Sequence, residues 1–130
     1  TTPGGNTEPT FDSCNLAEAA GAGFVGREVT LQTPALKNLI KAAIAYPGFS
    51  FVEVLSDCTE IYGRKNDLGE SPEMILSQKA DMRPEAFGNV ADQPFRPHRM
   101  QTGVIAKHDK PEYGAADRAR AAIEKARAGR

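Results

Sequence analysis

The sequence contains no tryptophan, only two cysteines and no long apolar run. Because aromatic residues are few, a folded core has to be built mainly from Ala, Val, Ile and Leu. No stretch approaches the roughly 20 apolar residues that a transmembrane helix needs, and the start of the chain lacks the pattern of a signal peptide. We therefore expect no membrane partner.

A surplus of charge of either sign is also absent. Sixteen Lys and Arg residues face 17 Asp and Glu residues, for a formal net charge of -1. Nucleic acids and anionic membrane surfaces are bound through many surplus basic residues, so the composition argues against both. With 130 residues, 40% of them hydrophobic, the chain fits one ordinary globular domain or less.

The two cysteines, Cys14 and Cys58, do not indicate a disulfide framework. A domain of this size needs no covalent staple and nothing suggests secretion, so we expect a reducing, cytoplasmic environment. The chain begins with Thr1 rather than an initiator Met, which predicts a processed or partial product.

Residues 49–55, Phe-Ser-Phe-Val-Glu-Val-Leu, carry the clearest strand signal. Both faces are mostly apolar, which predicts a strand covered on both sides of a parallel sheet, and Glu53 is the exception. Ligands gather at the carboxyl ends of strands in open α/β sheets. Chemistry is therefore expected in the polar loop of residues 56–66, which contains Cys58.

The flanking sequence predicts an α/β layer. Thr33 and Ser71 each precede a proline, the pattern of an N-cap followed by Pro at the first helical position. One strand, helix, strand unit with a right-handed crossover is expected, and the remaining strands of its sheet are predicted to belong to another segment. The expected helices span 15–20, 33–46, 71–79 and 117–128, and the expected strands begin at 24 and span 49–55 and 102–107.

Residues 81–100 are interrupted by Pro84, Pro94 and Pro97 and predict an irregular arm. A structureless loop of this length is unusual inside a compact domain, so we expect the arm to run over a partner surface or over another part of the same enzyme. Burial of Phe87, Phe95 and Ile105 against other chains or a missing half is predicted.

Candidate catalytic residues are scarce. His98 and His108 lack a paired nucleophile or a ligand spacing and are interpreted as exposed histidines. Cys14 is interpreted as a small buried hydrophobe. Cys58 is the candidate site residue, since small polar neighbours leave its sulfur approachable and supply the backbone N–H groups that a thiolate ligand uses.

Several segments resemble one family in chain order. They are Thr2–Asp12, Gly48–Cys58, Tyr62–Asn66 and Thr102–Tyr113. Together they resemble the C-terminal half of the β subunit of 2-oxoacid:ferredoxin oxidoreductases, most closely the 2-oxoglutarate type. The likeness covers almost the whole chain.

The resemblance implies a fold of the thiamine-diphosphate-binding α/β type with a parallel sheet, plus an extended C-terminal arm and helix. Residues 1–80 would be the C-terminal part of the thiamine-enzyme domain, and residues 81–130 would dock on partner chains. The implied activity is oxidative decarboxylation of a 2-oxo acid to an acyl-coenzyme A, with electrons passing through a [4Fe-4S] cluster to ferredoxin. The implied cofactors are thiamine diphosphate, Mg²⁺ and that cluster.

Within this resemblance Cys58 matches one cluster ligand, although Asp57 and Thr59 replace the prolines that commonly flank it. An adjacent carboxylate would tend to lower the cluster potential if it points that way. The family's upstream Cys-x-x-Cys and its Gly-Asp-Gly thiamine motif are absent, so no thiamine or Mg²⁺ ligand is assigned, and residues 1–6 are only possible neighbours of that site. The implied partners are the N-terminal part of the β subunit, an α subunit, ferredoxin, coenzyme A and a 2-oxo acid.

Two alternatives stay open. One is a non-catalytic α/β interaction module in which residues 81–130 form a docking arm and Cys58 only packs. The other is a related pyruvate, branched-chain or indolepyruvate enzyme, which would differ only in its substrate.

Overall fold

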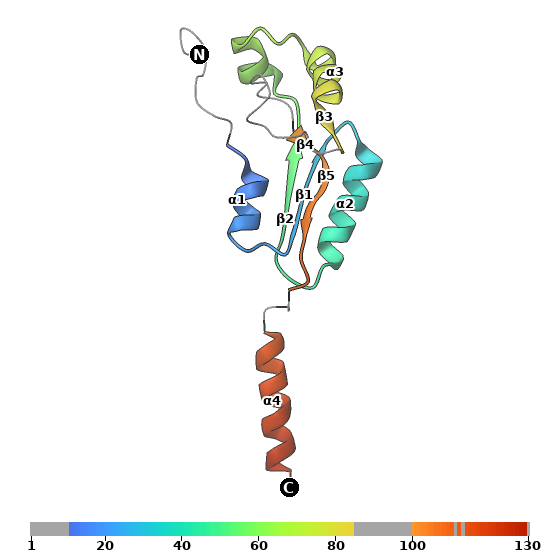
Figure 1. Cartoon of the computed structure of the whole chain (residues 1–130). Coiled ribbons are helices and arrows are strands. Elements are labelled where there is room, and N and C mark those ends of the chain that lie inside the picture. Colours follow the sequence, from blue (N-terminus) through green and yellow to red (C-terminus); the bar gives the residue numbers. More distant parts are fainter. Residues whose placement is uncertain (1–10, 85–99, 111, 113, 130) are drawn as a thin grey trace.

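The computed structural model describes residues 11–84, 100–110, 112 and 114–129, and Figure 1 shows their arrangement. Three longer strands and four α-helices make up most of this part of the chain. In chain order the elements are α1 (Ser13–Ala19), β1 (Phe24–Val29), α2 (Thr33–Ala45), β2 (Ser50–Leu55), the π-helical turn η1 (Thr59–Gly63), α3 (Ser71–Asp81), β3 (Met82–Arg83), β4 (Met100–Gln101), β5 (Gly103–Lys107) and α4 (Ala115–Ala128).

The main sheet has the order β2-β1-β5 and is mixed. β1 and β2 run parallel with Val25 opposite Phe51, joined by α2, as the strand, helix, strand pattern predicts. β5 lies antiparallel to β1 on the other side. The predicted parallel sheet is therefore correct for β1 and β2 and wrong for β5, whose direction no local sequence signal determines.

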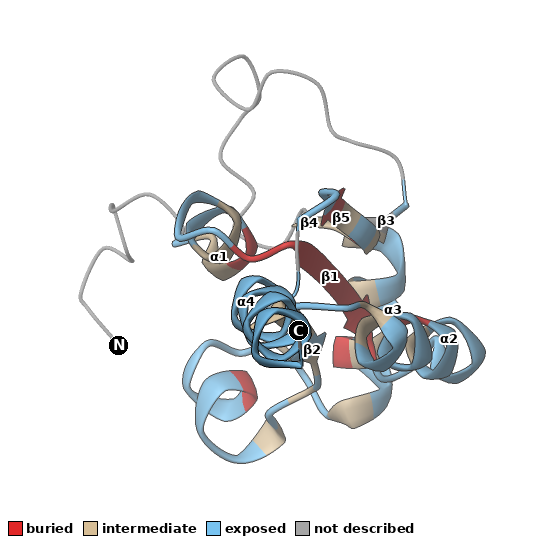
Figure 2. Ribbon diagram, turned by 90° about the horizontal axis from the view of Figure 1, so that it is seen from below, coloured by how far each residue is buried: buried red, intermediate tan, exposed pale blue. Residues whose placement is uncertain are grey.

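Helices cover both faces of β1. Gly26 faces α2, where an added Cβ would lie 2.6 Å from Leu39 Cδ1, so only glycine allows this close approach. The neighbouring Val25 faces the other side, toward Cys14 of α1. Since successive side chains of a strand point to opposite faces, β1 is buried along its whole length, as Figure 2 shows.

An ion cluster lies between β1, β2 and α1. The side chain of Arg27 is only 3% exposed, and its Nη2 lies 2.6 Å from Asp12 Oδ1 while its Nε donates to Glu53 Oε2. Ser13 Oγ donates to the other oxygen of Glu53. The charged residue that interrupts the apolar pattern of β2 is thus the partner of a buried guanidinium on the neighbouring strand.

Most predicted elements are confirmed, with small shifts at their ends. α2 is preceded by Gln32 rather than capped by Thr33, and α3 is capped by Glu70 rather than Ser71. In α3, Glu70 and Glu73 form a capping box that satisfies backbone N–H groups at both positions. Asp12 caps α1 by accepting from the N–H groups of Cys14 and Asn15.

The prediction that β2 is buried on both faces is wrong for the described chain. Phe49 is 68% exposed and Val54 is 44% exposed. β2 has a strand neighbour on one side only. Apolar side chains that a larger sheet would cover therefore remain in contact with solvent.

Residues 85–99, with Phe87, Phe95 and His98, lie outside the described residues. On either side of them, β3 and β4 form a short parallel pair. Ile105 packs in part against the cluster formed by Cys14, Val25 and its neighbours in its own chain. Its further burial against other chains or a missing half stays a prediction. Docking of residues 81–130 on partner chains otherwise stays a prediction.

Helix α4 extends away from the sheet in Figure 1, and none of its described residues is buried. Ile123, its one large apolar side chain, is 53% exposed. No helix in the described ranges has the length and apolarity needed to cross a membrane.

We predict that the isolated 130-residue chain does not fold autonomously. Apolar side chains on β2, α2 and α4 are exposed in this chain and would stay in water if it were alone. Burial of apolar surface is the main favourable term in folding. Purified alone, the chain should be insoluble or molten by near-UV circular dichroism. A sharp, cooperative thermal transition would contradict this.

Replacing Arg27 with Leu should destabilise the chain by about 1–3 kcal/mol, since it leaves two partly buried carboxylates, 35% and 25% exposed, without their shared hydrogen-bond donor. The urea dependence of proteolysis in the assembled protein measures this. Arg118→Leu is the matched control, because the Arg118–Glu112 pair lies in solvent and its loss should cost about 0–1 kcal/mol. Equal sensitivity of the two variants would show that the buried cluster has no special role.

Candidate functional site

The candidate site lies where β2 ends. Three residues, Ser56 to Cys58, connect Leu55 to the π-helical turn η1. β1 ends at the same edge of the sheet because the two strands are parallel and in register. Residues 56–66 thus begin at the carboxyl edge of the sheet, but residues 59–63 form η1 and not the predicted loop.

Cys58 is exposed and free, and it occupies the N-cap position of η1. The backbone N–H groups of Tyr62 and Ile61 hydrogen-bond its sulfur and hold the pKa of the thiol below its ordinary value, although the charges of Asp57 and Glu60 oppose this. Hydrogen bonds to the charged form favour it. The loop therefore presents a sulfur with increased thiolate character.

The position of Cys58 is fixed by the turn that follows it. Gly63 N–H donates to Cys58 O over 2.7 Å, and Gly63 is buried. An added Cβ at Gly63 would lie 2.7 Å from Met74 Sδ of α3 and 3.2 Å from Cys58 O, so a larger residue would require the Met74 side chain or the turn to shift. Single π-helical turns are uncommon and occur frequently at functional sites.

The carboxylate of Asp57 is engaged by α3, since Ser71 Oγ donates to its Oδ2 over 2.5 Å. Part of its hydrogen-bonding capacity is thus used within the chain. Its charge nevertheless lies close enough to Cys58 to oppose thiolate formation. A group bound at Cys58 would experience this negative charge.

Cys14 is a buried residue, as interpreted from the sequence. It is fully buried, and its Sγ lies 3.7 Å from Gly26 O. Burial raises the pKa of its thiol to about 11, with Arg27 acting in the opposite direction. A neutral, inaccessible thiol is a poor metal ligand.

The remaining candidates do not join Cys58. The described His108 is half-exposed and lies 2.8 Å from Glu18 through its Nε2, which is consistent with an ordinary surface histidine. Within the described ranges, no group of three or more His, Cys, Asp or Glu side chains could hold a metal ion. These residues can thus supply one thiolate but not a complete metal site.

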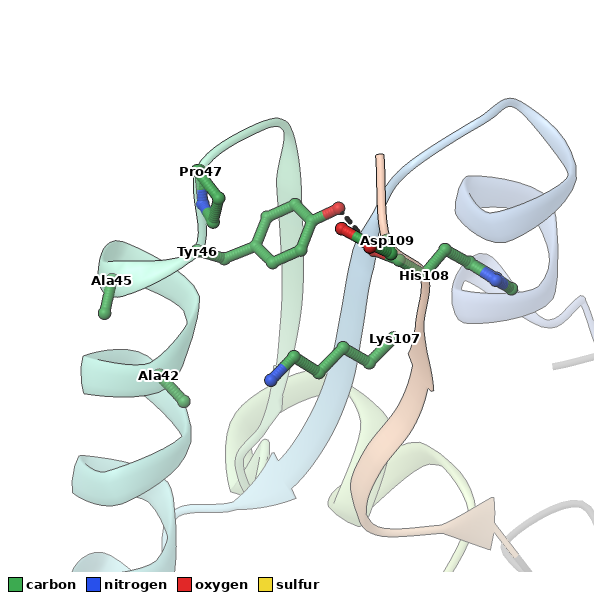
Figure 3. Close-up of a pocket in the computed structure, with 7 residues that line it drawn as sticks. All are labelled: Ala42, Ala45, Tyr46, Pro47, Lys107, His108 and Asp109. Carbon is green, nitrogen blue, oxygen red and sulfur yellow. Dashed lines mark hydrogen bonds between the residues drawn. The ribbon is translucent and has the colours of Figure 1, made fainter. Parts of the chain in front are cut away.

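A hollow of about 510 Å³ lies at the opposite end of the sheet (Figure 3). Tyr46 crosses it and donates to His108 O over 2.7 Å, and the Lys107 side chain lies beside the ring in the figure. The hollow is lined by residues at the end of α2 and at the end of β5. β2 begins at this end of the sheet, whereas Cys58 follows the other end of β2, so the hollow is remote from the loop of Cys58. It contains no nucleophile paired with a base.

Comparisons with known proteins identify similar chains. "2-oxoglutarate synthase subunit KorB" of Methanocaldococcus jannaschii is 33% identical over 122 residues, covering 87% of this chain and 42% of the relative. KorB of Methanothermobacter thermautotrophicus is 40% identical over 79 residues, 61% of this chain and 28% of the relative. KorB of Archaeoglobus fulgidus is 43% identical over 58 residues, 45% of this chain and 22% of the relative.

The matched regions lie in the C-terminal part of the relatives. The chain resembles the C-terminal half of KorB. This confirms the resemblance inferred from the sequence, and the chain spans less than half the length of these KorB relatives. No family model matches the sequence, and no solved structure matches it.

The difference between the two thiols predicts selective alkylation. In the purified native protein, treated with a chelator so that no metal blocks a thiol, iodoacetamide should modify Cys58 at neutral pH and leave Cys14 unmodified, because only the thiolate reacts. The rate at Cys58 should rise with a midpoint below pH 9.0, the ordinary value, whereas Cys14 should titrate near 11. Mass spectrometry of the alkylated peptides measures both rates, and faster reaction at Cys14 would contradict the assignment.

Proposed function

We propose that the chain is the C-terminal part of the β subunit of a 2-oxoacid:ferredoxin oxidoreductase, with 2-oxoglutarate as substrate. It would act in the cytoplasm together with the N-terminal part of the β subunit and an α subunit. The reaction is oxidative decarboxylation to an acyl-coenzyme A, with electrons delivered to ferredoxin. The substrate is supported by the names of the relatives, which are 2-oxoglutarate synthase subunits.

One observation carries the proposed role of this chain. An exposed cysteine with a lowered pKa stands at the carboxyl end of a parallel strand, and two backbone N–H groups hydrogen-bond its sulfur. Hydrogen bonds to sulfur are among the features by which a protein tunes an iron-sulfur cluster. Cys58 therefore fits as one thiolate ligand of a [4Fe-4S] cluster.

The fit is limited to one ligand. A [4Fe-4S] cluster is usually held by four thiolates, and Cys14, the other cysteine, is buried under α1. The remaining thiolates would come from outside this chain. Thiamine diphosphate and Mg²⁺ would likewise be held elsewhere, since no ligand for them is assigned among these residues.

When bound, thiamine diphosphate supplies the decarboxylation chemistry and the cluster supplies a path for electrons. The residues of this chain would hold and orient the Cys58 sulfur. η1 directs the N–H groups of Tyr62 and Ile61 at the Cys58 sulfur, which lowers the pKa of its thiol. Gly63, packed against Met74, keeps that turn in place.

Residues 81–130 are proposed to contribute to assembly as well as to the sheet. β5 completes one side of β1, while α4 exposes all of its described residues. A helix with Ala residues and Ile123 along one side gains little stability unless that side is covered. The docking role of the arm is thus assigned mainly to α4.

The test is the exchange of each cysteine for serine in the assembled enzyme. Cys58→Ser should lower ferredoxin reduction by at least about tenfold, since even loss of an outer-shell partner costs 10–100-fold in metal affinity or activity. Iron content should fall with it, while bound thiamine stays unchanged. Cys14→Ser is the matched control and should retain its iron.

Unchanged iron in Cys58→Ser would refute the ligand assignment. A complex that contains neither iron nor thiamine would instead favour the non-catalytic interaction module. Activity with pyruvate, a branched-chain 2-oxo acid or indolepyruvate in place of 2-oxoglutarate would leave the assignment of Cys58 intact and change only the substrate.

A further inference from the structure

A carboxylate beside Cys58 is held by helix α3. Ser71, the first residue of α3, donates from its Oγ to Asp57 Oδ2, and Asp57 directly precedes Cys58. We propose that Ser71 is a positioning residue that holds the Asp57 carboxylate partly out of water and next to the Cys58 sulfur, where its charge lowers the reduction potential of a bound iron-sulfur cluster. The inference rests on the proposed function, because it takes Cys58 as a cluster ligand.

Two residues of α3 hold the turn that contains Cys58. Ser71 contacts Asp57, the residue before the cysteine, and Met74 packs against Gly63, the last residue of η1. Residues three positions apart lie on the same side of a helix. One side of α3 therefore contacts the chain both before and after the sulfur.

The start of α3 does not need Asp57 as a cap. Glu70 and Glu73 form a capping box there, in which Glu73 Oε2 accepts from Glu70 N–H over 3.1 Å. The next residue, Pro72, has no N–H group to satisfy. The hydrogen bond from Ser71 thus orients the carboxylate of Asp57 and is not required to complete the helix.

The two carboxylates nearest to Cys58 in the sequence differ in exposure. Asp57 is half-buried, whereas the Glu60 side chain is 83% exposed and lies 3.6 Å from Arg64. Both charges act on the Cys58 sulfur, that of Asp57 more strongly. Dissolved ions screen an exposed charge more than a partly buried one. Asp57 is therefore the carboxylate with the larger effect on a group bound at this sulfur.

The charge of Asp57 opposes the addition of an electron. Net charge and hydrogen bonds to sulfur are two of the features that set the potential of an iron-sulfur cluster. The N–H groups of Ile61 and Tyr62 stabilise negative charge on the sulfur, and Asp57 acts against them. A lower potential makes the reduced cluster a stronger electron donor, which would favour delivery of electrons to ferredoxin in the proposed function.

The first experiment replaces Asp57 with Asn, which removes the charge and keeps an oxygen that can accept from Ser71. The complex is purified anaerobically through a tag on this chain and titrated with dithionite. Electron paramagnetic resonance follows the signal that is lost or altered in Cys58→Ser. Asp57→Asn should shift the reduction equilibrium about tenfold toward the reduced form, or about 59 mV for one electron. Glu60→Gln is the matched control and should shift it much less, because that charge is exposed.

The second experiment removes the hydroxyl of Ser71. In Ser71→Ala the carboxylate is free to turn into water, so the potential should rise, by less than in Asp57→Asn. Ser71→Thr keeps a hydroxyl donor and should retain the wild-type potential. In the Asp57→Asn background, Ser71→Ala should cause no further shift, because the charge that it positions is gone.

An unchanged potential in Asp57→Asn, or a lower potential in Ser71→Ala, would overturn the proposal. An equal shift from Ser71→Ala in both backgrounds, or loss of iron in that variant, would show that Ser71 only stabilises the turn and would overturn its positioning role. In either case Asp57→Asn still tests the effect of the charge. A wild-type complex without a signal that depends on Cys58 would instead show that the proposed function fails.

Discussion

The buried guanidinium of Arg27 is the interaction on which the described structure most depends. It bridges the end of the segment before α1, through Asp12, and the middle of β2, through Glu53. A charge removed from water is tolerated only when it is paired and hydrogen-bonded. Two segments that are distant in sequence are thereby held against β1.

The same interaction prepares the site. Arg27 and Glu53 are directly opposite in the parallel register of β1 and β2. Glu53 lies five positions before Cys58, so anchoring it limits where the following loop can leave the sheet. The turn at Gly63, closed by its hydrogen bond to Cys58 O, then completes the orientation of the sulfur. The sulfur of Cys58, the proposed ligand, is thus held in place although its neighbours are small and polar.

Local patterns in the sequence predict much of this arrangement. The Thr33-Pro34 and Ser71-Pro72 signatures place two helices within a residue of their observed starts. The apolar run of residues 49–55 places β2, and the loop after it places Cys58. These features depend on neighbours along the chain, which a sequence displays directly.

What the sequence does not predict depends on residues far apart. The partner of Glu53 is 26 positions away, so a carboxylate that appears to interrupt an apolar strand cannot be assigned from its surroundings. The antiparallel direction of β5 and the exposure of Val54 depend on which strands lie side by side in the sheet, and no local pattern determines that. The π-helical turn at η1 has no propensity signature comparable to an N-cap.

Anaerobic native mass spectrometry of the complex purified through a tag on this chain is the most direct measurement. If Cys58 is one ligand of a cluster completed elsewhere, the complex will contain iron and sulfide in equal number together with a polypeptide that aligns with the N-terminal part of KorB. Release of that polypeptide will release the cluster from this chain. A homogeneous, iron-free species composed of this chain alone would contradict the assignment.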